Sequence, residues 1–131
     1  MSTDGDLFER FLFAMIEGRH EEAEALLADD VVWNLPPFAK MAPIEGKQAV
    51  ARFIREAQAT YYEPGSLRLE PLLICVQAGR AACMAQLHAT TRNGKPYENR
   101  YAFFARLQRG LLCEVWELLD TASLQAQLRA S

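Results

Sequence analysis

The stretch "NGKPYENRYAFFARLQRGLLCEVWELLDT", residues 93–121, decides the fold. It holds two long segments rich in aromatic and aliphatic residues, 96–108 and 111–119, separated by the turn sequence Gln-Arg-Gly. The preceding Asn93-Gly94 pair is typical of a two-residue hairpin, because both residues tolerate positive φ. We therefore predict antiparallel strands here, followed by a short helix that Asp120 or Thr121 caps.

Two further strands are predicted directly upstream, at 67–77 and 80–91, with the turn "QAGR" between them. Four consecutive strands joined by short turns make an antiparallel meander. Strands of this length twist and coil, so the sheet is expected to curve.

The N-terminal half has helical periodicity instead. Helices are predicted at 7–16, ended by Gly18, at 21–28 and at 47–60, with a short strand at 31–35 that Pro36 and Pro37 end. Residues 38–46 are predicted to form a loop, of which 38–45 could act as a lid. The order α-α-β-α-β-β-β-β-α predicts one α+β domain over residues 1–131, in which three helices pack on a curved sheet. Such a cone-shaped barrel leaves a pocket at its open mouth.

Composition and charge argue against several classes of protein. The chain of 131 residues carries a net charge of −3, so nucleic acid is an unexpected partner, and no apolar run is long enough to cross a membrane. The start of the chain has no secretory signal. Cys75, Cys83 and Cys113 form no CxxC motif, which favours reduced, buried thiols in a cytoplasmic protein. The two histidines, His20 and His88, are far apart in the sequence, which argues against a metal site. His20 is expected at the surface.

The segment "EVWELLDT" places three acids near the end of the last strand. Alternation puts Glu117 on the face of Cys113 and Val115, and Glu114 on the opposite face, while Asp120 follows the strand. Glu117 is therefore predicted to point into the pocket, where burial would raise its pKa and suit it to act as a general base. The alternative is that Glu117 pairs with an arginine such as Arg100.

Other polar residues are candidates for a site around Glu117. His88 is predicted to shuttle a proton or orient Glu117, and its neighbour on the same face, Gln86, to position a substrate; a satisfied structural histidine is the alternative. Positioning roles are also predicted for Asn34, Asn99 and Trp33, and Tyr101 could donate to an oxyanion. For Trp33 and Tyr101, packing in the core is the competing interpretation.

The outer sheet face is predicted to be apolar. Trp116, Leu118, Phe104 and Leu87 are assigned to surfaces that are costly to leave in water. We therefore expect a homodimer through that face.

The chain resembles the nuclear transport factor 2-like superfamily, and within it the SnoaL-like group. The likeness rests on "EAEALLADDVVWNLP" (22–36), "IEGKQAVARFI" (44–54) and the 93–121 stretch. It implies kinship with polyketide cyclases, limonene-type epoxide hydrolases and ketosteroid isomerases. The polyketide cyclase likeness implies an acid acting as base in a mostly apolar pocket, with neither metal nor cofactor, on a small apolar molecule.

Matching individual residues narrows the chemistry that the resemblance implies. Epoxide hydrolases resemble this chain at Asn34 and Glu117, but Val32 stands where they have a tyrosine, and Gln86 and His88 replace their Arg-x-Asp pair. Ketosteroid isomerases have a tyrosine where this chain has Phe11. The expected activity is thus cofactor-independent proton transfer of the cyclase, isomerase or hydrolase type. The alternative is a non-catalytic ligand-binding or dimeric scaffold domain.

Overall fold

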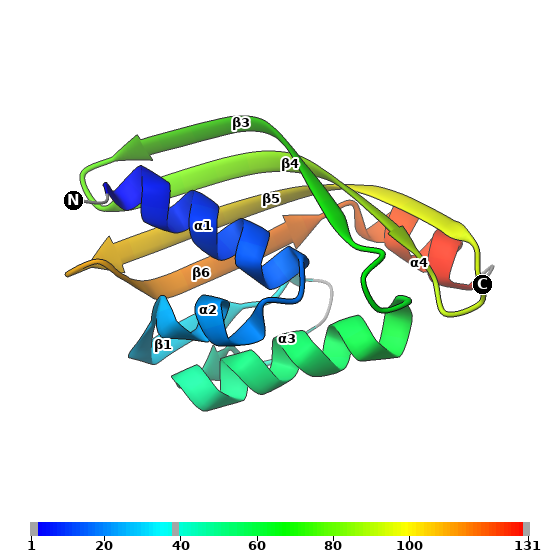
Figure 1. The fold of residues 1–131 in the computed structure, drawn as a ribbon, viewed down its shortest axis with the longest axis horizontal. Coiled ribbons are helices and arrows are strands. Elements are labelled where there is room, and N and C mark those ends of the chain that lie inside the picture. Colours follow the sequence, from blue (N-terminus) through cyan, green and yellow to red (C-terminus); the bar gives the residue numbers. More distant parts are fainter. Residues whose placement is uncertain (1–2, 38–39, 130–131) are drawn as a thin grey trace.

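The computed structural model describes residues 3–37 and 40–129. Its elements are α1 (Asp4–Ile16), α2 (His20–Ala25), β1 (Leu27–Asn34), β2 (Ile44–Glu45), α3 (Lys47–Tyr61), β3 (Arg68–Gln77), β4 (Arg80–Thr90), β5 (Pro96–Gln108), β6 (Leu111–Leu119) and α4 (Thr121–Arg129) (Figure 1). The predicted α+β order is confirmed, with the short strand β2 as the addition. None of the described helices is long and apolar enough to cross a membrane.

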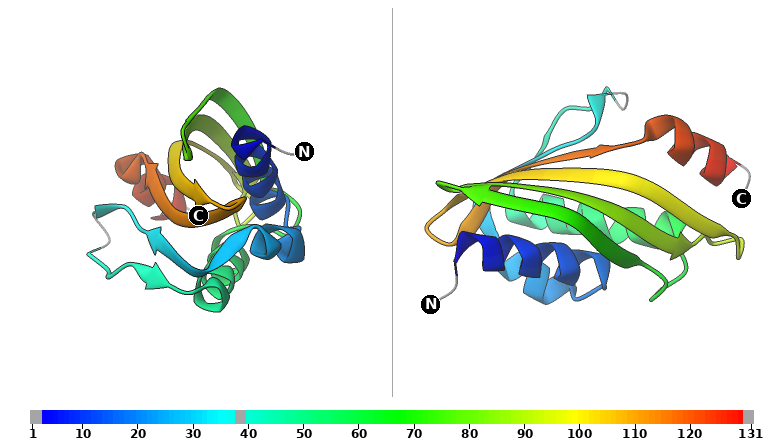
Figure 2. Two further views of the ribbon diagram at one scale, coloured as in Figure 1. Left: turned by 90° about the vertical axis from the view of Figure 1, so that its left-hand side faces the viewer. Right: turned by 90° about the horizontal axis from the view of Figure 1, so that it is seen from above.

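The six strands form one sheet in the order β2-β1-β6-β5-β4-β3. The strands β3 to β6 make the predicted antiparallel meander, while β1 runs parallel to β6. Figure 2 shows that the sheet curls without closing, with α1, α2 and α3 on its concave side and α4 at the far end. This curled sheet lined by helices matches the predicted cone.

The core fills the space between the helices and the concave face of the sheet. The helix α1 begins with a capping box between Thr3 and Asp6, and then buries Phe8, Phe11 and Leu12. Facing them are Trp33 and other fully buried side chains from the sheet, namely Leu27, Val31, Tyr97, Leu112 and Val115. The side chains of β4 and β5 alternate between buried and exposed, so each strand has one face in the core.

The second helix and the first strand differ from the prediction. The helix α2 ends at Ala25 rather than at 28, and β1 begins at Leu27 rather than at 31. Leu27 pairs with Leu112, and the Leu112 amide donates to the carbonyl oxygen of Leu26 at 2.9 Å. This pairing with a distant strand overrides the local helical pattern.

The predicted two-residue hairpin at Asn93-Gly94 is wrong. Only Gly94 has a positive φ, 79°, and the Thr91 amide bonds to the Lys95 carbonyl at 2.8 Å, which leaves three residues, 92–94, in the loop. Two-residue turns with positive φ at both positions occur instead at Ala78-Gly79 and Arg109-Gly110.

The segment between β1 and α3 contains the short strand β2. In it, β2 pairs with β1 through Glu45 opposite Val32 and Ile44 opposite Trp33. The predicted lid includes residues 38–39, which lie outside the described residues.

Candidate functional site

A small cavity lies between the helices and the concave face of the sheet, with a volume of about 100 Å³. Most of its wall is apolar, made by Met15, Ile16, Phe53, Ile54, Ala57, Leu67, Leu87 and Phe103. The polar side chains that reach it are Trp33, Gln58, Tyr101 and Glu117. Glu117 is therefore the one carboxylate in the lining, within a mostly apolar and aromatic wall to which Gln58 adds an amide.

Glu117 reaches this cavity from β6, where it pairs with Phe103 of β5. Its predicted direction is confirmed, because Phe103 belongs to the buried face of β5. The alternative pairing with Arg100 is wrong, because the Arg100 Nε donates to Gln86 Oε1 at 2.9 Å on the opposite face. Burial raises the pKa of the Glu117 carboxyl, and a hydrogen bond from Trp33 partly offsets that rise.

Trp33 provides that hydrogen bond. Its indole Nε1 donates to Glu117 Oε1 at 3.2 Å, and its side chain is 1% exposed. The ring also packs against Phe11 with centroids 6.2 Å apart. Trp33 therefore fills the core, as the packing interpretation has it, and also holds the one acid of the cavity in a fixed position.

Tyr101 belongs to a chain of buried polar groups that ends at the cavity. Its hydroxyl lies 3.0 Å from that of Tyr97, and the Asn99 Nδ2 donates to the Tyr97 hydroxyl at 3.0 Å. The same Nδ2 donates to the Asp120 carbonyl, and Asn99 Oδ1 accepts from the Arg100 amide, so the orientation of the Asn99 amide is fixed. Because Tyr97 accepts from Asn99, its own proton can go to Tyr101. Tyr101 then has its own proton to donate, and the Tyr62 side chain is already a hydrogen-bond partner beside it, which a substrate oxygen would have to replace.

Two members of this region were missed in the sequence. Tyr97 continues the alternation of Asn99, Tyr101 and Phe103 by two residues, so strand periodicity could have found it. Tyr62 follows α3, is 7% exposed and packs against Tyr97 with ring centroids 5.3 Å apart. Burial raises the pKa of both Tyr62 and Tyr101, which keeps these phenols protonated as hydrogen-bond donors.

The placement of His88 and Gln86 beside Glu117 is wrong. Both side chains lie on the convex face of β4, while the neighbouring Leu87 lines the cavity. The His88 ring nitrogens contact carboxylates instead, with Nδ1 2.9 Å from Glu98 and Nε2 3.0 Å from Glu70. The alternation along β4 was correct, but the sequence did not fix which of its faces meets the cavity.

Asn34 also lies outside the cavity. Its Nδ2 donates to Glu114 Oε2 at 3.0 Å and to the Val115 carbonyl at 3.2 Å, and Glu114 is paired with Arg106 at 3.0 Å. Asn34 therefore joins β1 to β6 on the face opposite Trp33. Asn99 is brought near the site, but its amide is fully engaged and supports Tyr97 rather than the cavity.

The convex face of the sheet exposes apolar side chains. Leu73 is 61% exposed, Met84 45%, Phe104 40% and Leu118 41%. Two hollows lie on this face. The larger, about 680 Å³, is lined by Phe104 and Trp116 and also by Arg80 and Arg106. The smaller, about 190 Å³, is lined by Leu73, Met84 and Phe104. Leu87, predicted to belong to such an exposed surface, is instead 3% exposed on the concave side.

In the described part of the chain, no three His, Cys, Asp or Glu side chains meet in a way that could hold a metal ion. The polar groups of the cavity are thus one carboxylate, one indole N–H, a tyrosine hydroxyl and the Gln58 amide, within mostly apolar walls. This arrangement can accept a proton at one point and donate a hydrogen bond at another.

A family model identifies the class to which this protein belongs. The model of the SnoaL-like domain matches residues 8–115, and the chain therefore belongs to the SnoaL-like family. No curated protein matches the sequence.

Solved structures share the fold at low identity. A protein of unknown function from Burkholderia pseudomallei, described as NTF2-like, superposes with a TM-score of 0.83 at 22% identity, covering 98% of both chains. IdmH from Streptomyces antibioticus, described as a putative polyketide cyclase, gives 0.81 at 20% identity and covers 98% of this chain and 99% of its own. A Catenulispora acidiphila protein with a ketosteroid isomerase-like fold gives 0.80 at 12% identity, covering 97% and 95%.

Proposed function

We propose that this protein is a cofactor-independent enzyme that moves a proton on a small, mostly apolar carbonyl compound, with Glu117 as the general base. The observation that carries the proposal is the single carboxylate in an apolar cavity, with its Oε1 3.2 Å from the Trp33 indole nitrogen. Burial raises the pKa of Glu117, which brings a carboxyl group closer to the basicity that proton abstraction near neutral pH requires.

The proposed reaction begins at a carbon next to the substrate carbonyl. Glu117 takes a proton from that carbon, the C–H electron pair moves into the carbon–carbon bond, and the carbonyl oxygen gains the negative charge of an enolate. In a substrate with a carbon–carbon double bond beside that carbon, the enolate is a dienolate; the protonated Glu117 then returns the proton to the far carbon of the double bond, which shifts into conjugation with the carbonyl, as in an isomerase. Alternatively, the enolate carbon attacks a second carbonyl of the same molecule, as in a cyclase, and the proton goes to the new alkoxide.

Tyr101 is the proposed donor to the enolate oxygen. It lines the same cavity as Glu117, and Tyr97, itself held by Asn99, supplies its hydroxyl with a hydrogen-bond partner. A phenol kept protonated by burial is a suitable donor to a developing oxyanion. His88, Gln86 and Asn34 have no part in this proposal, since all three lie on the opposite face of the sheet.

The experiment is a pH–activity profile on a panel of epoxides, lactones and polyketide-like ketones, with Glu117→Gln beside the wild type. We expect turnover of ketones that rises as Glu117 loses its proton, and a loss of roughly a hundredfold or more in the variant. Full activity in Glu117→Gln would exclude this base. Absence of turnover across the panel would favour the non-catalytic scaffold.

We also propose a homodimer formed through the convex sheet face. The support is the group of exposed apolar side chains there, which includes Leu73, Met84, Phe104 and Leu118. Such a contiguous apolar surface is costly in water and typical of an interface. We propose a cytoplasmic location as well, because all three cysteines are free thiols and a reducing compartment keeps them so. Their predicted burial is correct for Cys83 and wrong for Cys75, which is exposed.

A further inference from the structure

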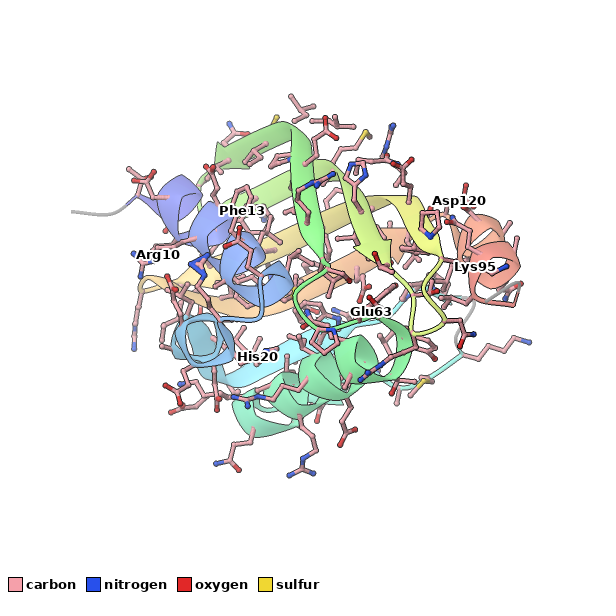
Figure 3. The ribbon with its side chains drawn as sticks, turned by 45° about the vertical axis from the view of Figure 1, so that its right-hand side comes forward. Arg10, Phe13, His20, Glu63, Lys95 and Asp120 are labelled. Atoms are coloured by element: carbon pink, nitrogen blue, oxygen red, sulfur yellow. The ribbon has the colours of Figure 1, made fainter. Side chains whose placement is uncertain are left out.

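A second hollow adjoins the cavity on its outer side. It has a volume of about 330 Å³ and lies between the end of α1, the start of α2, α3, the connection from α3 to β3, and the turn after β4. Figure 3 shows two of its residues, His20 and Glu63, which reach it from the start of α2 and from the α3–β3 connection. We call it the outer cleft.

The outer cleft and the cavity have a common wall. Ile16, Gln58 and Leu67 line both of them. Tyr62 lines the outer cleft and packs on Tyr97, the hydrogen-bond partner of Tyr101. The two spaces are therefore separated by a few side chains rather than by a layer of the fold.

Volume indicates that the cavity is not the whole site. Ligand pockets usually occupy roughly 300–1,000 Å³, whereas the cavity around Glu117 has about 100 Å³. A substrate whose reacting carbon lies beside Glu117 must then extend elsewhere. The outer cleft is the adjoining space, and with it the site reaches the usual range.

Gln58 is the polar member of the three side chains that line both spaces. Its Nε2 donates to the Met15 carbonyl at 2.8 Å, and this hydrogen bond joins α3 to the end of α1. Gln58 is a flexible polar side chain, held by that bond across the common wall.

The outer cleft differs from the cavity in charge. It contains two guanidinium groups, from Arg55 and Arg92, and no ion pair among the described residues involves either of them. Of its two acids, Glu17 is neutralised by Arg19 at 3.0 Å, which leaves Glu63. The cleft therefore has an excess of positive charge.

His20 contributes a polar group to the same wall. Its predicted surface position is only partly correct, because the side chain is half-buried in the cleft. Burial, and secondarily the charge of Arg55, lower its pKa, which favours the neutral imidazole near pH 7. Neutral His20 can donate one hydrogen bond next to the two guanidinium groups.

We infer that the substrate is amphipathic, with an apolar, carbonyl-bearing end beside Glu117 and a carboxylate in the outer cleft, held by Arg55 and Arg92. This inference rests on the proposed function and adds the substrate class to it. Guanidinium groups suit a carboxylate because their planar donors match its two oxygens.

The test uses a matched pair of probes, 3-phenylpropanoate and 4-phenylbutan-2-one, which share a phenylethyl group and differ in charge. All titrations are made in a Trp116→Phe background, so that Trp33 is the remaining one of the two tryptophans. Calorimetry gives the dissociation constants, and Trp33 fluorescence reports whether a probe reaches the cavity. The variants are Arg55→Met and Arg55→Met with Arg92→Met. Arg52→Met, at an exposed position of α3 outside the cleft, is the control.

We expect the carboxylate to bind more tightly than the ketone and to change Trp33 fluorescence. The double variant should weaken carboxylate binding about tenfold or more and leave ketone binding unchanged, because a charged hydrogen bond is lost only by the carboxylate. Arg55→Met alone should show part of the loss, and it keeps the bond from Arg92 Nε to the Ala59 carbonyl. Arg52→Met should match its parent.

Equal weakening of both probes, or none, would overturn the inference. Carboxylate binding that leaves Trp33 fluorescence unchanged would overturn the connection between the two spaces. The same titrations in Glu117→Gln separate this inference from the proposed function. Charge-dependent binding there supports the outer cleft even if Glu117 proves not to be a base.

Discussion

The indole Nε1 of Trp33, on β1, donates a hydrogen bond of 3.2 Å to Glu117 Oε1, on β6. The two residues are 84 positions apart in the chain, and the parallel pairing of β1 with β6 brings them together. This bond gives the half-buried carboxylate a defined partner. Several consequences can be measured.

The first prediction concerns stability and pH. Burial raises the pKa of Glu117 in the folded state above its unfolded value, so the folded protein holds this proton more tightly. The resulting stabilisation is fully present below the unfolded pKa and is lost as pH rises through the folded pKa. Relative to Glu117→Gln, the wild type should therefore become less stable across that window. Urea unfolding of both proteins from about pH 4 to about pH 9 measures the difference; a constant difference would contradict a buried, titrating carboxylate.

The second prediction concerns the Trp33 hydrogen bond. Replacing Trp33 by Phe removes a donor that favours the ionised carboxylate, so the pKa of Glu117 should rise further. The ascending limb of the pH–activity profile should move to higher pH. Trp116→Phe, on the convex face, should leave that limb in place. An unmoved limb in Trp33→Phe would show that the limb reports another group.

The third prediction concerns the tyrosine pair. Tyr101→Phe should lower kcat by about a hundredfold if its hydroxyl holds the oxyanion. Tyr97→Phe, one hydrogen bond further from the cavity, should have a smaller effect. Equal losses in the two variants would contradict a direct role for Tyr101, and would indicate that the pair acts on structure alone.

The fourth prediction concerns His88. Its ring nitrogens contact Glu70 and Glu98 on the convex face, away from Glu117. His88→Gln should therefore keep the wild-type kcat and the wild-type pH profile. A pH profile that loses a limb in this variant would restore His88 to the reaction and refute the assignment given above.

The fifth prediction concerns the convex face. Phe104→Glu places a charge in the centre of the exposed apolar group and should convert a dimer into a monomer, as measured by sedimentation velocity. Met41→Lys is the control, because Met41 is 61% exposed but lies in the segment between β1 and β2. A wild type that sediments as a monomer would contradict the proposed interface.

Much of the fold was predictable from the sequence, because the long strands have clear turn signals. The bounds of β5 and β6 agree with the prediction to the residue, and β3 and β4 differ from it by one residue at one end. One error came where a distant partner decides the local structure, since Leu112 pairs with Leu27 and extends the strand. The other was local, in the type of turn at Asn93-Gly94.

Less of the site was predictable, because alternation defines two faces of a strand without saying which is concave. For β6 the prediction placed Glu117 on the face that meets the cavity, which is correct. For β4 a polar side chain was taken as the sign of a pocket, although His88 and Gln86 are satisfied by Glu70, Glu98 and Arg100 on the other face. Which face of a strand meets the cavity depends on its register with neighbouring strands, and the local sequence does not encode that register. This is why the face was predicted correctly for Glu117 on β6 and wrongly for His88 on β4.

The central claim is that Glu117 takes a proton from a carbon next to a carbonyl. The most direct measurement is solvent deuterium incorporation into 4-phenylbutan-2-one, followed by proton NMR in D₂O with wild type and with Glu117→Gln. We predict exchange at the carbons beside the carbonyl that the wild type accelerates and the variant slows by roughly a hundredfold or more. Exchange at the same rate in both proteins would contradict the claim.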